Sequence, residues 1–85
     1  MKRINKRVAR RLFDEGKTII ICACKLRPGG PLYIRKYWNP EIIVNKTNMS
    51  NRYYPETIYF DRIVRDYEWY NCTYETGYYS AFYIN

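Results

Sequence analysis

The stretch TIIICACK, at residues 18–25, decides the fold of this 85-residue chain. Beta-branched residues favour strands, and successive side chains of a strand point to opposite faces. The alternation gives one face Thr18, Ile20, Cys22 and Cys24, and the other Ile19, Ile21 and Ala23. Because both faces are apolar, the stretch is expected to be a central strand of a sheet.

A basic amphipathic helix is predicted just before this strand. Asn5 can cap its N-terminus, and Gly16 can supply the left-handed residue that ends it. At about 100° per residue, one side carries the apolar residues Val8, Ala9, Leu12 and Phe13. The opposite side carries the bases Lys2, Arg3, Lys6, Arg7, Arg10 and Arg11. We therefore expect the apolar side to pack on the sheet and the bases to face outward.

The rest of the chain shows short strand patterns and one more helix pattern. RPGGP at 27–31 is typical of a turn, and Leu32–Trp38 of a second strand. EIIVN at 41–45 is compatible with a short third strand, and 46–57 has loop composition. Within 58–67 the helix period is carried by Phe60, Ile63, Val64 and Tyr67. A closing hairpin is predicted from aromatic residues at 67–74, the turn ETG at 75–77 and YYSAFYI at 78–84.

These patterns predict a single small domain of the α+β class over residues 1–85. It would combine a small antiparallel β-sheet with the N-terminal basic helix, a second short helix and a C-terminal β-hairpin. No apolar run is long enough to span a membrane, and the basic start lacks the apolar core of a secretory signal. We therefore expect a cytoplasmic protein without a membrane partner.

Charge is concentrated in the first part of the chain. The first 36 residues carry a net charge of +9 and the rest −2, which gives +7 overall and a pI near 9.5. Such a distribution is typical of proteins that bind nucleic acid, an anionic surface or an acidic protein. A solvated basic face that only keeps the domain in solution is the alternative.

The chain is also unusually rich in aromatic residues, with 11 tyrosines among its 85 residues. Exposed rings can stack unpaired bases or anchor protein interfaces, and buried ones complete a thin core. In the last strand Tyr78 and Phe82 fall on one face and Tyr79 and Tyr83 on the other. Besides the helix bases, the candidate contacts with a partner or nucleic acid are Arg35, Lys36, Trp38, Tyr53, Tyr54, Tyr79 and Tyr83.

The chain contains no histidine, which excludes histidine-dependent catalytic triads and histidine-ligated zinc. A zinc site from Cys22, Cys24 and Cys72 would need an acid as its fourth ligand, so we expect free thiols and no metal or cofactor. The acids of the second helix pattern alternate with arginines, as on a solvated helix face. We expect no enzyme, although an RNase toxin of the RelE type can work without histidine. No motif of that type is found.

Three segments, RRLFDEGKTIIICACKLRP, FDRIVRDYEWYNC and ETGYYSAFY, resemble small accessory proteins of phages and mobile elements of low-GC Gram-positive bacteria. These proteins have no assigned chemistry, so the resemblance transfers no site residue. It implies a genomic setting in which small proteins often inhibit host defence nucleases, anti-CRISPR proteins among them.

The basic first part of the chain, its many tyrosines and the resemblance to phage accessory proteins together predict a non-enzymatic protein. This protein would bind and inhibit a host defence nucleoprotein in an anti-CRISPR-like manner. Its partner would be a host protein or ribonucleoprotein effector. A small basic protein that binds single-stranded DNA or RNA is the first alternative, and the histidine-free RNase toxin is the second.

Overall fold

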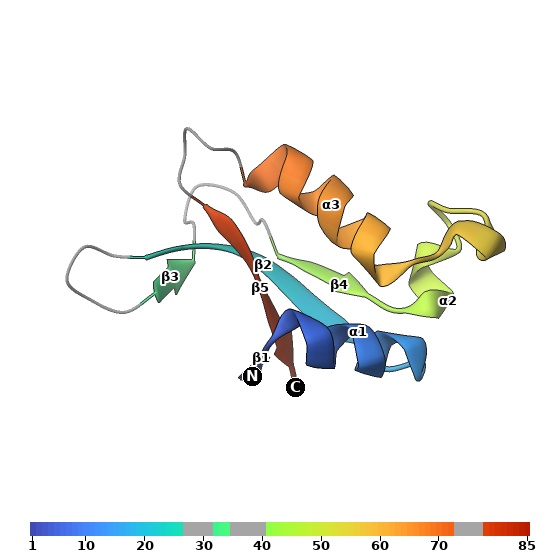
Figure 1. The fold of residues 1–85 in the computed structure, drawn as a ribbon, viewed down its shortest axis with the longest axis horizontal. Coiled ribbons are helices and arrows are strands. Elements are labelled where there is room, and N and C mark those ends of the chain that lie inside the picture. Colours follow the sequence, from blue (N-terminus) through green and yellow to red (C-terminus); the bar gives the residue numbers. More distant parts are fainter. Residues whose placement is uncertain (27–31, 35–40, 73–77) are drawn as a thin grey trace.

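The computed structural model describes residues 1–26, 32–34, 41–72 and 78–85 and has the predicted α+β architecture (Figure 1). In chain order the elements are β1 (Lys2–Ile4), α1 (Lys6–Asp14), β2 (Ile19–Leu26), β3 (Leu32–Ile34), β4 (Ile42–Val44), α2 (Lys46–Met49), the 3-10 turn η1 (Pro55–Thr57), α3 (Phe60–Asn71) and β5 (Tyr79–Ile84).

Strand β2 is the centre of an antiparallel sheet, as its two apolar faces predict. β5 pairs with it along Ile20–Cys24, and β1 pairs with the outer edge of β5. The other edge of β2 is shared, because its first half pairs with β4 and its second half with β3. The two ends of the chain therefore lie side by side on neighbouring strands (Figure 1).

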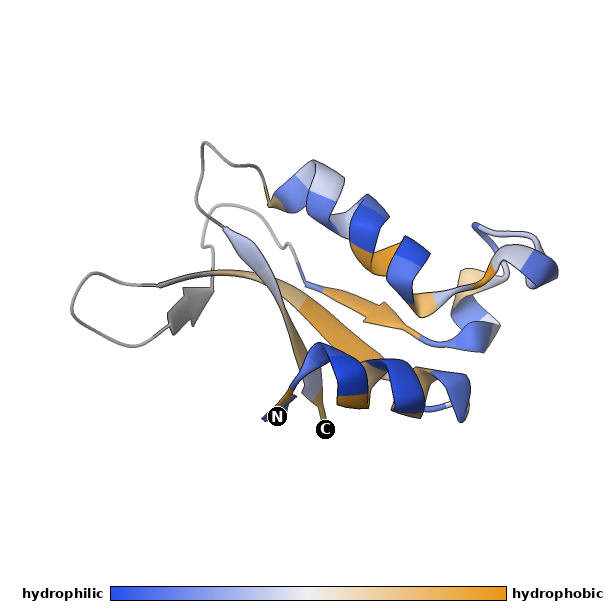
Figure 2. Cartoon of the chain, in the orientation of Figure 1, coloured by the Kyte–Doolittle hydropathy of each residue, from blue (hydrophilic) through white to orange (hydrophobic). Residues whose placement is uncertain are grey.

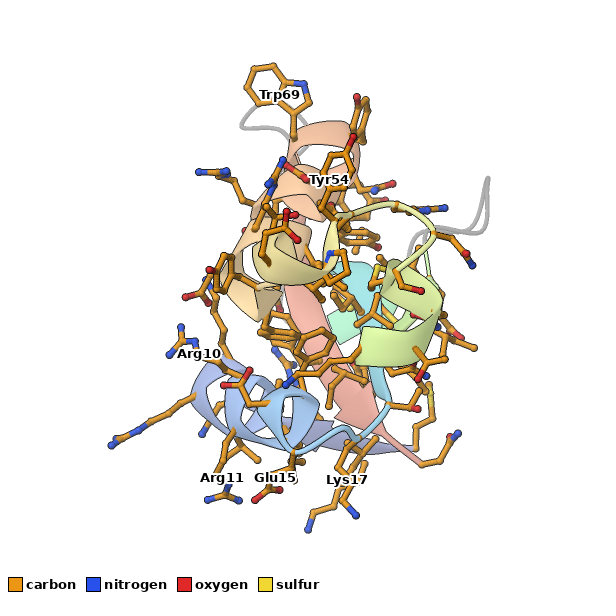
Figure 3. All side chains as sticks on the ribbon, turned by 90° about the vertical axis from the view of Figure 1, so that its right-hand side faces the viewer. Arg10, Arg11, Glu15, Lys17, Tyr54 and Trp69 are labelled. Carbon is orange, nitrogen blue, oxygen red and sulfur yellow. The ribbon has the colours of Figure 1, made fainter. Side chains whose placement is uncertain are left out.

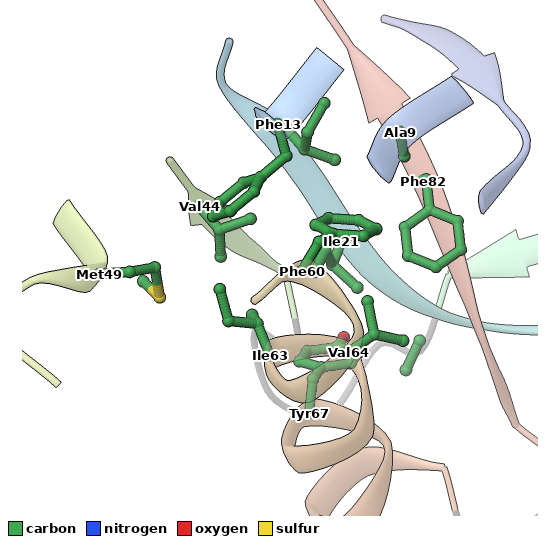
Figure 4. Close-up of a cluster of buried hydrophobic side chains, with 12 residues drawn as sticks. Ala9, Phe13, Ile21, Val44, Met49, Phe60, Ile63, Val64, Tyr67 and Phe82 are labelled. Carbon is green, nitrogen blue, oxygen red and sulfur yellow. The ribbon is translucent and has the colours of Figure 1, made fainter. Parts of the chain in front are cut away.

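One face of the sheet packs against the helices. The rings of Phe13 and Phe60 lie 5.4 Å apart and those of Phe60 and Phe82 lie 5.6 Å apart, so Phe60 joins both helices to the sheet (Figure 4). The tilted rings have the geometry that aromatic pairs prefer. Ile63, Val64 and Tyr67 complete the buried side of α3. Hydrophobic residues accordingly colour β2 and β4, whereas hydrophilic residues cover most of α1 and α3 (Figure 2).

The opposite face of the sheet carries a separate buried cluster. It consists of Ile20, Cys22, Cys24 and Ala81, with Tyr79 and Tyr83 packed against it. The alternation predicted for β2 and β5 is therefore confirmed on both strands.

The local signals that predicted α1 are confirmed. Oδ1 of Asn5 accepts a hydrogen bond from the amide of Val8 at 2.8 Å, and Gly16 has a φ of +90°. The Gly16 amide donates to the carbonyl of Phe13 at 2.9 Å and closes the helix. Ala9 and Phe13 are fully buried, whereas Leu12 is half-buried at the margin of the core.

Helix α1 carries fewer of the predicted bases than expected. It begins at Lys6, whereas Lys2 and Arg3 lie on β1. Ile4 pairs with Phe82 and packs on the helix-side cluster, which draws the first residues into the sheet. Residues directly opposite each other in an antiparallel pair share a face. Lys2 therefore lies on the helix side, opposite Ile84, and Arg3 on the far side, opposite Tyr83. The expectation of one face with six bases is wrong.

Two further expectations need correction. Residues 46–57 contain α2 and η1, where a loop was expected. The aromatic run from Tyr67 was expected to be a strand, but α3 continues to Asn71, whose side-chain amide donates to the carbonyl of Tyr67 at 2.9 Å. The first arm of the predicted hairpin is thus helical as far as Asn71, and residues 73–74 lie outside the described residues. β5 pairs with β1 and β2. The turns predicted at 27–31 and 75–77, and the end of the strand predicted over Leu32–Trp38, lie outside the described residues.

Candidate binding surface

Helix α1 presents cations that form no ion pair with any acid among the described residues. Lys6, Arg7 and Arg11 are exposed, and the first turn contains no acidic residue. In the described part of the chain, none of the three makes an ion pair. A positive charge near a helix N-terminus is unfavourable for the helix dipole, so Lys6 and Arg7 do not stabilise α1.

Arg10, the fourth base of α1, has an internal partner. Its Nη2 and Nε lie 2.9 and 3.0 Å from Oδ1 of Asp61, which connects α1 to α3. The two side chains are 43% and 58% exposed, so the pair contributes only a fraction of a kcal/mol to about 1 kcal/mol. Arg10 was predicted to contact a partner, but here its charge is already paired.

Lys2 and Arg3 do not extend this surface, because they lie on opposite faces of the sheet. The predicted contacts Arg35, Lys36 and Trp38 lie outside the described residues.

Among the predicted tyrosines, Tyr53 has a structural role. Its hydroxyl donates to Oδ2 of Asp66 at 2.6 Å, and the Arg62 guanidinium lies 5.2 Å from its ring centroid. Burial, and then the hydrogen bond to Asp66, raise the pKa of Tyr53 to about 12. Its ring is therefore already stacked and its hydroxyl already bonded.

The other three predicted tyrosines differ in exposure. Tyr79 and Tyr83 are half-buried on the far face of the sheet, where the Tyr83 hydroxyl lies 3.9 Å from Sγ of Cys24. Burial and the nearby Cys24 raise the pKa of Tyr83. Only Tyr54 of the four is highly exposed, at 77%.

Among the described residues, the two most exposed aromatic side chains lie on α3 and were not predicted as contacts. Trp69 is 78% and Tyr70 79% exposed, and Tyr59, just before the helix, is 63% exposed. The signal for them was present in the sequence. Continuing the period of Phe60, Ile63, Val64 and Tyr67 by one turn puts Trp69 opposite the buried side. The assignment of this run to a strand concealed that position.

Trp69 is one member of a ridge on the outer side of α3. At 100° per residue Arg62, Arg65 and Trp69 fall within an arc of about 60° opposite the buried residues, and all three are exposed. We call these three residues the α3 ridge. Trp69 projects at the end of the molecule opposite Arg11 and Lys17, and Arg10 lies between them (Figure 3).

A groove with a volume of about 710 Å³ follows one flank of the ridge, between α1 and α3. It is lined by Lys6, Tyr59, Asp61, Arg62, Arg65 and Glu68. Asp61 is neutralised by its ion pair with Arg10, whereas Glu68 accepts a hydrogen bond from the Ser80 hydroxyl at 3.0 Å and keeps its negative charge. Within the described residues neither Lys6 nor Arg65 forms a hydrogen bond or an ion pair. The groove therefore presents uncompensated positive charge.

A second groove, with a volume of about 530 Å³, follows the other flank. It lies between α3 and the β4–α2 segment, and Ile42, Met49, Arg52, Tyr53, Trp69 and Tyr70 are among its lining residues. The ridge thus separates a charged groove from one in which four of the ten lining residues are aromatic.

The thiols do not converge on a metal site. Cys22 and Cys24 lie on the far face of β2, whereas Cys72 follows α3 and packs on the helix-side cluster. Burial, and then the Glu41 carboxylate, whose Oε2 lies 3.9 Å from Sγ, raise the pKa of Cys22 to about 12. Across the described residues no three metal-binding side chains lie together, and none of the three cysteines forms a disulfide.

No helix in the described part of the chain has both the length and the apolar character needed to cross a membrane. Comparison of the chain with protein-family models, with curated proteins and with solved structures gives no match.

Proposed function

We propose that this chain is a non-enzymatic binding protein that occupies a host defence nucleoprotein and inhibits it, in the manner of an anti-CRISPR protein. The observation that carries the proposal is the outer side of the helical layer. There, Lys6, Arg7 and Arg11 are exposed without an acidic partner in the described residues, and the α3 ridge adds two arginines and a tryptophan.

The two parts of this surface would act at different stages of binding. Unpaired charge on α1 attracts an anionic partner over long distances and speeds the encounter. Burial of exposed rings slows dissociation, and tryptophan, tyrosine and arginine are the residues that most often dominate interface energies. Trp69 and Tyr70 serve as anchors in place of Tyr79 and Tyr83, two of the predicted aromatic contacts, because these two tyrosines are half-buried.

The positive sign of the surface limits how it can inhibit. A basic surface does not mimic DNA. It would therefore not fill a DNA-binding channel, because such a channel is itself lined with lysine and arginine side chains. It fits an exposed RNA strand or an acidic protein surface of the effector.

The test is a tagged pull-down from the host lysate with and without RNase, followed by a cleavage assay with the purified effector. We expect a stoichiometric nuclease or effector subunit that remains after RNase treatment and whose cleavage activity falls when the protein is added. Arg7→Glu should weaken capture, whereas Lys17→Glu, the same charge change away from the ridge, should not. Recovery of RNA alone would instead support the stand-alone nucleic-acid-binding alternative. Recovery of neither would overturn both.

A further inference from the structure

We infer that the charged groove between α1 and α3, together with the α3 ridge, is a binding site for a single-stranded nucleic acid. This inference rests on the proposed function and deepens it, because it adds a contact with the nucleic acid of the complex to the contact with its protein. The site would hold the phosphate backbone with Lys6, Arg62 and Arg65, and one unstacked base on the indole of Trp69.

The spacing of the ridge suits a strand that runs along α3. A rise of about 1.5 Å per residue puts Trp69 about 10 Å beyond Arg62 along the helix axis, with Arg65 between them. Binding sites for single strands combine a positive groove that follows the backbone with aromatic rings on which bases stack. Here the two arginines of the groove and the exposed ring of Trp69 occur on one helix, and Tyr59 is an exposed ring that lines the groove itself.

The cations of this site are available to phosphates. Asp61 is already paired with Arg10, so the three cations of the groove face one other acid, Glu68, and a net positive charge remains. Arg62 is held over the Tyr53 ring, and the Tyr53 hydroxyl is fixed by Asp66. Since this contact orders the Arg62 side chain before a ligand arrives, binding costs less conformational entropy.

The exposed rings favour a single strand over a duplex. Stacking on Trp69 requires a free base face, and the bases of a duplex are already stacked on one another. An acidic protein segment could pair with the arginines, but it would have no planar base to place on the 78% exposed indole.

The test is fluorescence anisotropy with a labelled oligonucleotide of about 12 nucleotides, at 50 and 200 mM salt, as oligo-U, oligo-dT and a duplex. Three phosphate contacts predict a log–log salt slope of about −2 for the single strands. The duplex should bind at least about tenfold more weakly.

Matched variants separate stacking from charge. Trp69→Ala should weaken binding by about 5- to 150-fold and leave the salt slope unchanged. Arg65→Gln should reduce the slope by about 0.7. The controls Tyr54→Ala, an exposed ring outside both grooves, and Lys17→Gln, a cation distant from Trp69, should each change the affinity less than twofold. Circular dichroism verifies that every variant is folded.

Absence of binding at low salt, equal affinity for the duplex, or equal effects of the control variants would overturn the site. Similar affinity for oligo-U and oligo-dT would support a site that contacts phosphates and base faces. Preference for oligo-U would support the same site and identify RNA as its ligand. If the protein inhibits the purified effector but binds no oligonucleotide, the site is wrong and the proposed function stands. If it binds oligonucleotides but inhibits no effector, the site stands and the function is wrong.

Discussion

Arg10 shows why a charge pattern overstates a binding surface. From the sequence it is one of six equivalent bases, but its partner Asp61 is 51 residues away along the chain. Only the packing of α1 against α3 brings the two together. Tyr53 is a similar case among the aromatic residues. Asp66 accepts a hydrogen bond from its hydroxyl, and the Arg62 guanidinium lies over its ring. Local patterns identify which residues carry charge or rings, but the fold determines which of them are free.

The Tyr53–Asp66 hydrogen bond should contribute to stability in a pH-dependent way. The raised pKa means that folding favours the neutral phenol, so the stabilisation is present below pH 10 and is lost as the pH rises towards about 12. Tyr53→Phe should lower the free energy of unfolding by about 1–2 kcal/mol at pH 7 and by less at pH 11. Urea unfolding at both pH values measures this difference. Tyr54→Phe is the control, and an equal loss there would contradict the assignment.

The Cys22 thiol should be unreactive in the folded protein. The thiolate is the nucleophile, and a pKa near 12 leaves almost none of it at pH 8. We expect iodoacetamide to modify Cys22 at least about 100-fold more slowly in the native protein than in urea, as measured by peptide mass spectrometry. Equal rates in the two states would mean that the far face of the sheet is open to solvent.

At the scale of elements, α1 and β2 could be predicted because their signals are local. Asn5, Gly16 and the helix period specify α1 within 12 residues, and the alternation of β2 needs only its own sequence. The faces of β5 were predictable for the same reason.

β1 could not be predicted in this way, and the end of α3 was predicted wrongly, because distant partners decide between the local patterns. Ile4 belongs to a strand only through Phe82, 78 residues later, and three residues have no period of their own. From Tyr67 onward, aromatic residues favour a strand by propensity. The burial of Tyr67 against the sheet overrides that preference, which leaves Trp69 and Tyr70 exposed.

The attachment of α1 should depend on Phe13 more than on any base. Phe13 is fully buried and contacts the Phe60 ring, so Phe13→Ala would leave a cavity between α1, α3 and the sheet. We expect it to lower the free energy of unfolding by about 3–5 kcal/mol in urea titrations. Arg11→Ala, on the exposed side, should change it by no more than about 0.5 kcal/mol. A small effect of Phe13→Ala would mean that α1 is held by other contacts.

At the scale of the whole molecule, binding and stability make opposite demands on the charge. The net charge of +7 repels itself in the folded state, and the helix dipole disfavours Lys6 and Arg7 in the first turn of α1. The same cations would attract an anionic partner. A surface that reduces stability in this way is consistent with a role in binding.

Salt should therefore shift stability and binding in opposite directions. We expect the melting temperature to rise between 50 and 200 mM salt, because screening weakens the repulsion among the lysine and arginine side chains. The affinity for a single-stranded nucleic acid should fall over the same range. Arg7→Glu removes two units of net positive charge and puts an acid where the dipole favours one. It should raise the melting temperature at low salt by about 2–6 °C and reduce its salt dependence. Lys17→Glu changes the charge equally but beyond the C-terminus of α1, so its melting temperature should rise less. If Arg7→Glu lowered the melting temperature, Arg7 would be a stabilising residue and its availability to a partner would be refuted.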